Sequence, residues 1–180
     1  NVSNTGLQQF LAKCSATLKD LNLEACTNMS GEGLENVPVL KLEKLDLQES
    51  EVSNTGLQQF LAKCSATLKD LDLRFTNISG EGLENVPVLK LEKLNLKNCR
   101  NLTQKGVMEL LAKCSATLKD LNLRFTNMSG EGLENVHVLK LEKLDLEVSQ
   151  VSNIGLQQFL AKCSATLKDL NLDSTDISGE

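Results

Sequence analysis

The stretch LAKCSATLKDLNL, residues 11–23, decides the fold because nearly the same string returns at Leu61, Leu111 and Leu160. Its cysteine therefore recurs at intervals of 50, 50 and 49 residues. A fixed period of this size is the sequence signature of a repeat architecture, in which each unit packs against its neighbours in the chain. The chain is therefore expected to be a stack of similar units rather than a domain built around one centre.

Each unit carries the pattern L-x-x-L-x-L twice, first as LKDLNL and then as LEKLDL. The last three positions alternate apolar and polar residues, which predicts a short, half-buried strand. Seven strands are predicted, and the leucines that close them are 23 to 27 residues apart. Because a connection of that length is a crossover and not a hairpin, we expect a parallel sheet. The closing leucines are Leu23, Leu47, Leu73, Leu96, Leu123, Leu146 and Leu172.

Two kinds of crossover alternate between these strands. Each begins with a Ser or Thr that precedes a Gly by three residues, and a hydroxyl at that place favours a helix N-cap. The segment GLQQFLAKC predicts a helix with one buried apolar face, as at Leu57, Phe60, Leu61 and Cys64. The segment GLENVPVLK is shorter and contains proline, which predicts a single turn or 3₁₀ segment. The clearest hydroxyl starts are Ser30, Ser53, Thr103 and Ser152.

With these patterns the chain resembles the leucine-rich-repeat family, in the alternating two-module form of the ribonuclease-inhibitor type with cysteine-containing segments. The resemblance covers essentially all of residues 1–180. It implies an α/β right-handed solenoid, or horseshoe, with a parallel β-sheet on the concave face. We expect one leucine-rich-repeat domain of about seven repeats in alternating modules, without terminal caps. The resemblance also implies a non-catalytic scaffold that recognises a protein or peptide.

The chain departs from the family at the turn after each strand. Small hydrogen-bonding residues replace the usual Asn there, and we expect them to satisfy buried backbone groups less completely. The two turns that contain cysteine also carry one extra residue before the next apolar anchor. The replacing residues are Cys26, Ser50, Thr76, Cys99, Thr126, Ser149 and Thr175.

The composition argues against several classes of function. A net charge of −5 argues against a general nucleic-acid binder, and the absence of a run of about 18 apolar residues argues against a membrane span. No secretory signal is visible, and the single histidine, His137, stands where two other units have proline. No nucleophile motif, phosphate-binding Gly loop or paired carboxylates with a base recur. We therefore expect no enzymatic activity and no cofactor.

The six cysteines invite a disulfide or metal interpretation, and their spacing favours neither. Helix cysteines two strands apart should lie roughly 10 Å from one another, beyond the ~7 Å Cα limit for a bridge. No Cys or His spacing typical of a metal site occurs. We expect buried free thiols and a cytoplasmic, reducing compartment. Glycosylation sequons leave an extracellular surface as the alternative, at Asn1, Asn28, Asn77, Asn101 and Asn127.

The residues between and just after the leucines should face the concave side. Two columns that alternate in sign, starting at Lys19 and Asp20, are interpreted as structural because alternation keeps like charges apart on neighbouring strands. Positions that vary between units are the candidates for partner binding, with a basic and aromatic middle and acidic ends. This pattern predicts a partner with an acidic centre. The candidate residues are Glu24, Asp46, Gln48, Glu49, Asp72, Arg74, Phe75, Asn95, Lys97, Asn98, Asn122, Arg124, Phe125, Asp145, Glu147 and Asp173.

The five phenylalanines divide into two groups. We expect Phe10, Phe60 and Phe159 on the buried crossover face, and Phe75 and Phe125 on the concave surface. Two alternatives to partner recognition remain open: a structural, engineered or fragmentary repeat scaffold with no partner of its own, and an extracellular ligand-binding ectodomain. Exposed sheet edges at both ends predict end-to-end self-association.

Overall fold

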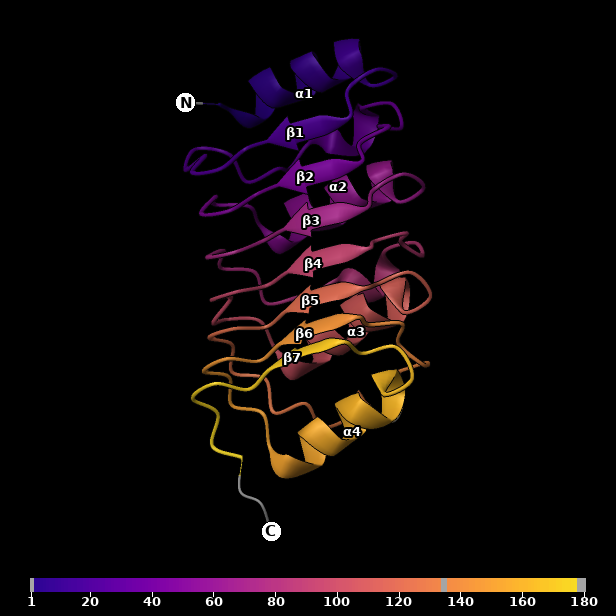
Figure 1. Ribbon diagram of the computed structural model, residues 1–180. Helices are drawn as coiled ribbons and strands as arrows, with labels where there is room; N and C mark the ends of the chain where they lie inside the picture. Colours follow the sequence, from indigo (N-terminus) through magenta and orange to yellow (C-terminus); the bar gives the residue numbers. More distant parts are fainter. Residues whose placement is uncertain (1, 134–135, 178–180) are drawn as a thin grey trace.

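A computed structural model describes residues 2–133 and 136–177 of the chain. Seven strands of three residues each form one sheet whose spatial order follows the chain (Figure 1). Every neighbouring pair is parallel, as the spacing predicts. The strands are β1 (Asp20–Asn22), β2 (Lys44–Asp46), β3 (Asp70–Asp72), β4 (Lys93–Asn95), β5 (Asp120–Asn122), β6 (Lys143–Asp145) and β7 (Asp169–Asn171).

The leucine pattern sets the register of the sheet. Leu21 on β1 pairs with Leu45 on β2, and the central leucines of all the later pairs also face one another. Asp20 consequently lies opposite Lys44, and Lys44 lies opposite Asp70. The predicted alternation of sign across the sheet is confirmed.

Helices of 11 residues form the longer crossovers, and each starts at a hydroxyl cap. The Ser53 hydroxyl accepts a hydrogen bond from the Gly56 amide at 3.0 Å, which confirms the predicted N-cap. The shorter crossovers contain the predicted 3₁₀ turns η1 (Leu34–Asn36) and η2 (Leu83–Asn85). The helices are α1 (Asn4–Cys14), α2 (Asn54–Cys64), α3 (Gln104–Cys114) and α4 (Asn153–Cys163).

The prediction that Ser30 caps a helix is wrong. The 3₁₀ turn that follows begins only at Leu34, and no side chain caps it. Gly31 and Gly33 both have positive φ, so the backbone after Ser30 is not helical. The Ser30 hydroxyl instead accepts a hydrogen bond from the Asn4 amide of α1 at 2.8 Å, tying this loop to the preceding helix.

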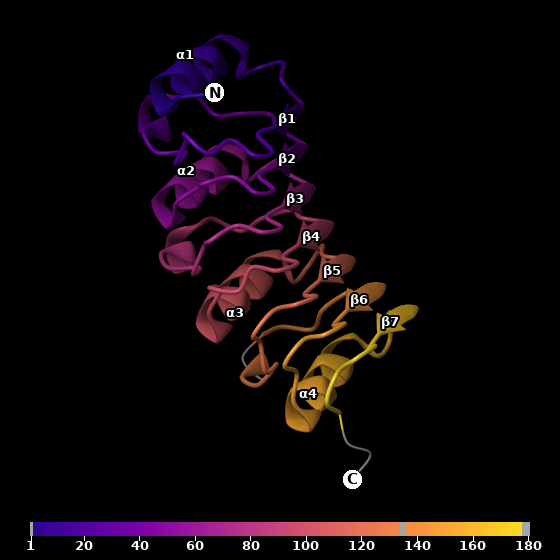
Figure 2. The same ribbon diagram turned by 90° about the vertical axis from the view of Figure 1, so that its left-hand side faces the viewer.

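The strands line the inner side of a curve and the helices its outer side, as Figure 2 shows. The core is a repeating slot between the sheet and the crossovers, filled chiefly by leucine side chains. Phe60 and Phe159 are fully buried in this slot, as predicted. In the described part of the chain, no helix is long and apolar enough to cross a membrane.

The prediction that Phe10 is buried is wrong, because 51% of its surface is exposed. The Phe60 ring packs against the preceding loop, where a Cβ added to Gly31 would lie 3.0 Å from it. Phe10 occupies the same position in α1, and no described crossover precedes that helix to cover it. Burial at this position depends on the neighbouring unit and not on the helix alone.

Candidate functional site

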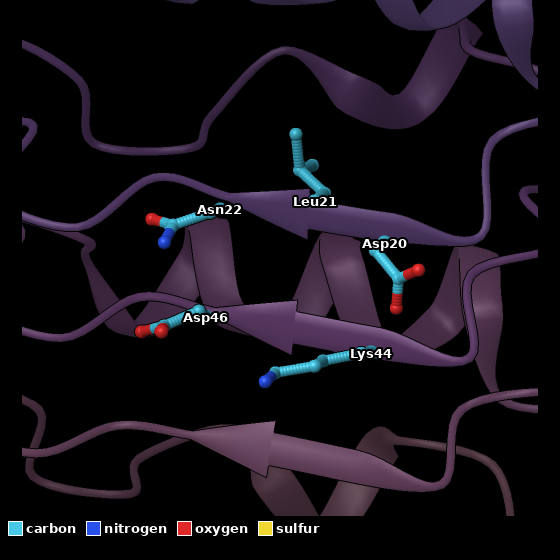
Figure 3. Close-up of a pocket in the computed structure, with 5 residues that line it drawn as sticks. All are labelled: Asp20, Leu21, Asn22, Lys44 and Asp46. Carbon is cyan, nitrogen blue, oxygen red and sulfur yellow. The ribbon is translucent and has the colours of Figure 1, made fainter.

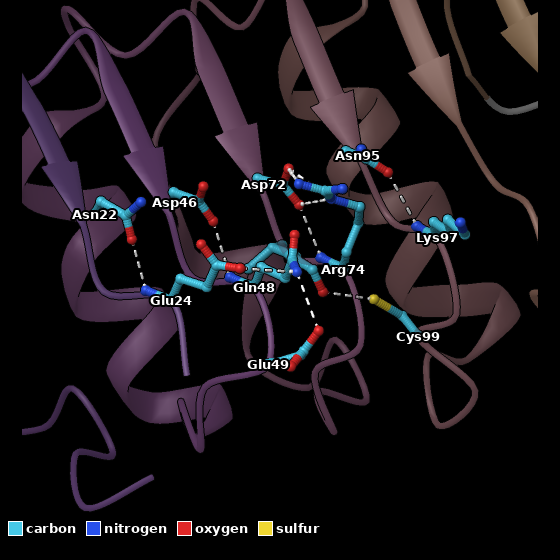
Figure 4. Close-up of polar contacts among 11 residues, drawn as sticks. Asn22, Glu24, Asp46, Gln48, Glu49, Asp72, Arg74, Asn95, Lys97 and Cys99 are labelled. Carbon is cyan, nitrogen blue, oxygen red and sulfur yellow. Dashed lines mark hydrogen bonds and ion pairs between the residues drawn. The ribbon is translucent and has the colours of Figure 1, made fainter. Parts of the chain in front are cut away.

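Each strand ends in an Asn or Asp whose side chain closes a turn. The side-chain oxygen accepts the backbone amide two residues later, for example Asn22 from Glu24 at 2.7 Å (Figure 4). The same bond recurs at all seven strands, with distances up to 3.2 Å. This local hydrogen bond guides the chain out of the strand. It gives a structural role to the candidate residues Asp46, Asp72, Asn95, Asn122 and Asp145.

The third residue after each strand adopts left-handed backbone geometry. Its φ lies between 51° and 59° in every unit. This geometry costs a non-glycine residue about 1–2 kcal/mol, and Asn is among the few types that adopt it readily. Hydrogen bonds to the next strand continue through the turn and hold the backbone there, as from the Phe75 amide to the Lys97 carbonyl at 3.0 Å. The residues are Ala25, Glu49, Phe75, Asn98, Phe125, Val148 and Ser174.

Five side chains at the ends of β3, β4 and β5 form what we call the basic–aromatic strip: Arg74, Phe75, Lys97, Arg124 and Phe125. The Lys97 ammonium lies 5.7 Å from the centre of the Phe75 ring and 5.9 Å from that of Phe125. The Arg124 guanidinium also lies 5.7 Å from the centre of the Phe125 ring. These distances are within the range of cation–π attraction, so Lys97 joins the two rings into one surface.

The two arginines of the strip are paired differently. Arg74 makes a two-pronged ion pair with Asp72, the last residue of the preceding strand β3, with Nε and Nη2 each 2.8 Å from Oδ2. Asp72 also raises the pKa of Arg74. The equivalent strand residue in the next unit is the uncharged Asn122, and Arg124 pairs instead with Glu147 on the neighbouring turn. The Nε of Arg124 is buried and has no acceptor among the described residues.

These ion pairs neutralise both arginines, so less free positive charge remains at the centre of the concave face than the sequence predicts. Within the strip, Lys97 has no carboxylate at ion-pairing distance among residues 2–133 and 136–177. Glu147 belongs to the ion pair with Arg124 and is not a separate acidic end. Two further candidate residues, Asn98 and Glu147, lie next to the strip, and Asn98 occupies the turn between the Phe75 and Phe125 rings.

The other candidate residues lie away from the strip. Gln48 donates to Glu24 at 3.1 Å and to Glu49 at 3.0 Å at the β1–β2 end, next to Asp46. Asp173 follows β7 at the opposite end. The predicted acidic ends are therefore separate features at the two ends of the sheet.

A shallow hollow of about 400 Å³ lies over β1 and β2 on the concave face (Figure 3). Its polar walls belong to the repeating charge columns and to the turn-closing Asx residues, which the sheet itself explains. The columns bear direct ion pairs: the Glu43 carboxylate is 2.9 Å from both Lys19 and Lys69. These two lysines lower the pKa of Glu43 to about 2. The hollow is lined by Asp20, Leu21, Asn22, Lys44 and Asp46.

The small polar residues in the turns hydrogen-bond to buried carbonyl groups, as the sequence predicts. The Thr76 hydroxyl donates to the Leu73 carbonyl at 2.7 Å, and the Cys99 thiol donates to the same carbonyl at 2.9 Å. Hydrogen bonding of the buried polar groups in these turns is incomplete, because the buried Ser149 hydroxyl has no partner within the described ranges.

All six cysteines are free thiols, and four of them are buried. Burial raises the pKa of Cys64 to about 12 and that of Cys99 to about 11, so these thiols are poor nucleophiles at neutral pH. His137 is exposed on a crossover. Among the residues that the structure describes, no group of three His, Cys, Asp or Glu side chains is arranged to hold a metal ion.

The predicted binding residues do not include Arg100 or Val148, although the sequence pattern places Val148 on the concave side. They line a second hollow of about 350 Å³ beside the Phe125 ring. The signal for Arg100 was the extra residue in the turn that follows Cys99, which displaces this side chain from the ordinary repeat pattern. The remaining lining residues are Thr126, Asn127 and Gln150.

Two segments of the chain, residues 64–86 and 114–136, match a protein family described as Leucine Rich repeat. They are equivalent parts of two successive units, each running from the end of a helix through a strand and into the next crossover. No curated protein matches the chain.

Proposed function

The chain is a leucine-rich-repeat protein, and from this premise we propose that it binds a protein or peptide on its concave side, through the basic–aromatic strip. Leucine-rich repeats are generally protein-interaction modules, and the family is typically a non-catalytic scaffold. The family assignment therefore supports recognition as the kind of function, and the local chemistry supports the place.

The observation that carries the proposal is the clustering of like charges at Arg74, Lys97 and Arg124. Each of these residues lies two positions after the end of a strand, and the three strands, β3, β4 and β5, are neighbours roughly 4.8 Å apart. Like charges on neighbouring strands destabilise a sheet, and the other charged columns avoid this by alternating in sign. Arg74 and Arg124 each have a carboxylate partner, but Lys97 between them has none among the described residues, so this column is not balanced by alternation as the others are. An unbalanced cation beside two rings favours a role in binding, and Arg and aromatic residues are enriched at binding hot spots.

The two phenylalanines support the same conclusion. Phe75 and Phe125 occupy left-handed positions that local preference opposes, and Phe75 remains 41% exposed. Asn98 fills the equivalent position between them, which indicates that a small polar residue meets the needs of the turn. Large rings at these two places therefore add exposed apolar surface at a cost in local stability, a combination typical of sites kept for function.

The test uses 12-residue peptides selected from a random phage-displayed library on the immobilised chain. A variant carrying Phe75→Asn and Phe125→Asn should fold with an unchanged or higher Tm, because Asn tolerates the left-handed turn. We expect the selected peptides to bind this variant at least about tenfold more weakly, since two exposed aromatic anchors are lost.

The matched control is Val88→Ser, which removes an apolar side chain on a crossover that is more exposed than either ring. Selected peptides should bind this variant as they bind the unaltered chain. Peptides that bind the Phe75→Asn, Phe125→Asn variant with full affinity, or that lose affinity for Val88→Ser instead, would place recognition elsewhere and contradict the proposal.

We further propose that the chain works in a reducing compartment, because its cysteines are free and mostly buried. The exposed sequon residues Asn28, Asn77, Asn101 and Asn127 support the extracellular alternative. Mass spectrometry of protein purified from its natural source distinguishes the two. Unmodified asparagines with six free thiols agree with the reducing compartment, and occupied sequons contradict it.

A further inference from the structure

We infer that the strip, extended by Arg100, takes an acidic–apolar peptide, in which a carboxylate meets Arg100 and neighbouring apolar side chains pack on Phe125 and Val148. This inference rests on the proposed function and names the chemistry of its partner. It depends on three observations: which cations are unpaired, where Arg100 is held, and what lines the hollow beside it.

The first observation is that only some cations here are available to a partner. Arg74 and Arg124 are each paired with a carboxylate of the chain itself. Lys97 and Arg100 have no carboxylate within 4.0 Å in the described part of the chain. The charge that remains to be complemented is therefore concentrated on these two side chains, which lie on successive parts of the same turn.

The second observation is that Arg100 is oriented by a neighbour. Its Nε–H donates to the Asn98 side-chain oxygen at 2.8 Å, and its own carbonyl accepts from the Asn127 amide at 3.0 Å. A guanidinium has five N–H donors, so the terminal nitrogens keep donors free for an acceptor. Their planar geometry suits a carboxylate, which a guanidinium binds through two parallel hydrogen bonds.

The third observation is the mixed character of the hollow. Arg100 and Asn127 supply its polar side, while the Phe125 ring and Val148 supply its apolar side. Val148 is 39% exposed and, like Phe125, occupies a left-handed turn position. One acidic side chain flanked by leucine- or valine-sized side chains would meet both surfaces together.

The charge of the rest of the chain limits the partner further. The net charge is −5, and acidic side chains lie toward the ends of the sheet: Glu24 and Glu49 after β1 and β2, and Asp173 after β7. A polyanion would be repelled by most of this surface, whereas a single local carboxylate reaches the cations without approaching the acidic ends. The expected occupant is therefore a peptide with one or two acids among apolar residues, and not a nucleic acid or a polyacidic tail.

The test measures fluorescence anisotropy with three labelled 12-residue peptides. The first places two glutamates among leucines and valines, the second replaces both glutamates by lysine, and the third is polyglutamate. We expect the first peptide to bind the chain at least about tenfold more tightly than either of the others. Raising the salt from 50 to 500 mM should weaken this binding, because the carboxylate contact is exposed.

The variants separate this contact from general charge. Arg100→Ala should weaken binding of the first peptide about five- to tenfold, and Arg100→Lys should recover only part of it, because an ammonium lacks the planar fork. Lys90→Ala removes an exposed cation from a crossover and should change the affinity less than about twofold. Circular dichroism melting of each variant confirms that the fold is intact.

Three outcomes overturn the inference: no binding of the first peptide up to about 1 mM, equal binding of the polyglutamate peptide, or unchanged binding by Arg100→Ala. Each leaves the proposed function standing if library-selected peptides still depend on Phe75 and Phe125. If the library-selected peptides also bind without Phe75 and Phe125, both this inference and the proposed function are contradicted.

Discussion

Replacing Gly56 by Ala tests how successive crossovers pack against each other. An added Cβ would lie 1.9 Å from the Ser30 carbonyl oxygen and 2.9 Å from the Gly31 Cα. Ordinary carbon–oxygen contacts are about 3.3 Å or longer, so the loop would have to move by roughly 1.4 Å. That loop is held by the Ser53 amide, which donates to the same Ser30 oxygen at 2.9 Å.

The expected loss of stability follows from three contributions. Forced overpacking costs about 1–3 kcal/mol, and weakening the Ser53–Ser30 hydrogen bond adds about 1 kcal/mol. The higher helix propensity of Ala returns at most about 1 kcal/mol. We therefore expect Gly56→Ala to lower the free energy of unfolding by about 1–4 kcal/mol, and the Tm by about 2–16 °C for a chain of this size.

Gly6→Ala is the matched control because residues 3–14 and 53–64 have the same sequence. A Cβ at Gly6 meets only the Ser3 hydroxyl, at 3.3 Å, since no described loop precedes α1. This variant should be neutral or more stable by up to about 1 kcal/mol. Urea and thermal unfolding followed by far-UV circular dichroism measure both, as the chain has no Trp or Tyr. Equal stability of the two variants would refute the packing described for the crossovers.

Three further outcomes are expected. Cys64 should stay unmodified by a thiol reagent at pH 8 while the half-exposed Cys14 reacts, and rapid labelling of both in native protein would contradict the burial described. The Glu43 carboxyl, followed by NMR, should titrate near pH 2, and an ordinary pKa would disprove the ion pairs. Because its folded pKa lies below 4.5, the contribution of Glu43 to stability is present above pH 4.5 and disappears as the pH falls from 4.5 to 2. Asp72→Asn should cost about 1–2 kcal/mol by leaving Arg74 without its carboxylate, and an unchanged urea midpoint would show that this pair adds nothing.

Much of the architecture could be predicted because the leucines fix it. The central leucine of each L-x-x-L-x-L pattern must be buried, and this sets the register that brings Asp20 beside Lys44. The helix cap at Ser53 also follows from local sequence. Ser30 and Phe10 could not be predicted in the same way: positive-φ glycines redirect the chain after Ser30, and burial of a ring at position 10 needs a neighbouring unit.

The sequence predicted many of the residues of the candidate site, but it did not predict which ion pairs these residues make. Arg74 and Arg124 stand in identical RF dipeptides, yet Arg74 pairs with Asp72 in its own unit and Arg124 pairs with Glu147 on the neighbouring turn. The difference arises from one residue two positions earlier, Asp72 or Asn122, and from which side chain the next strand presents. Apart from Asn98, the residue types do not signal the left-handed turn positions, because glycine is absent from all seven.

The most direct test of partner recognition by the basic–aromatic strip is an NMR titration of the ¹⁵N-labelled chain with a library-selected peptide. Recognition at the strip predicts that the largest shifts fall on the backbone amides of Arg74, Phe75, Lys97 and Phe125, with those of the crossovers unmoved. Shifts concentrated around Val88 and His137 on the crossovers, with the strip amides unchanged, would contradict it.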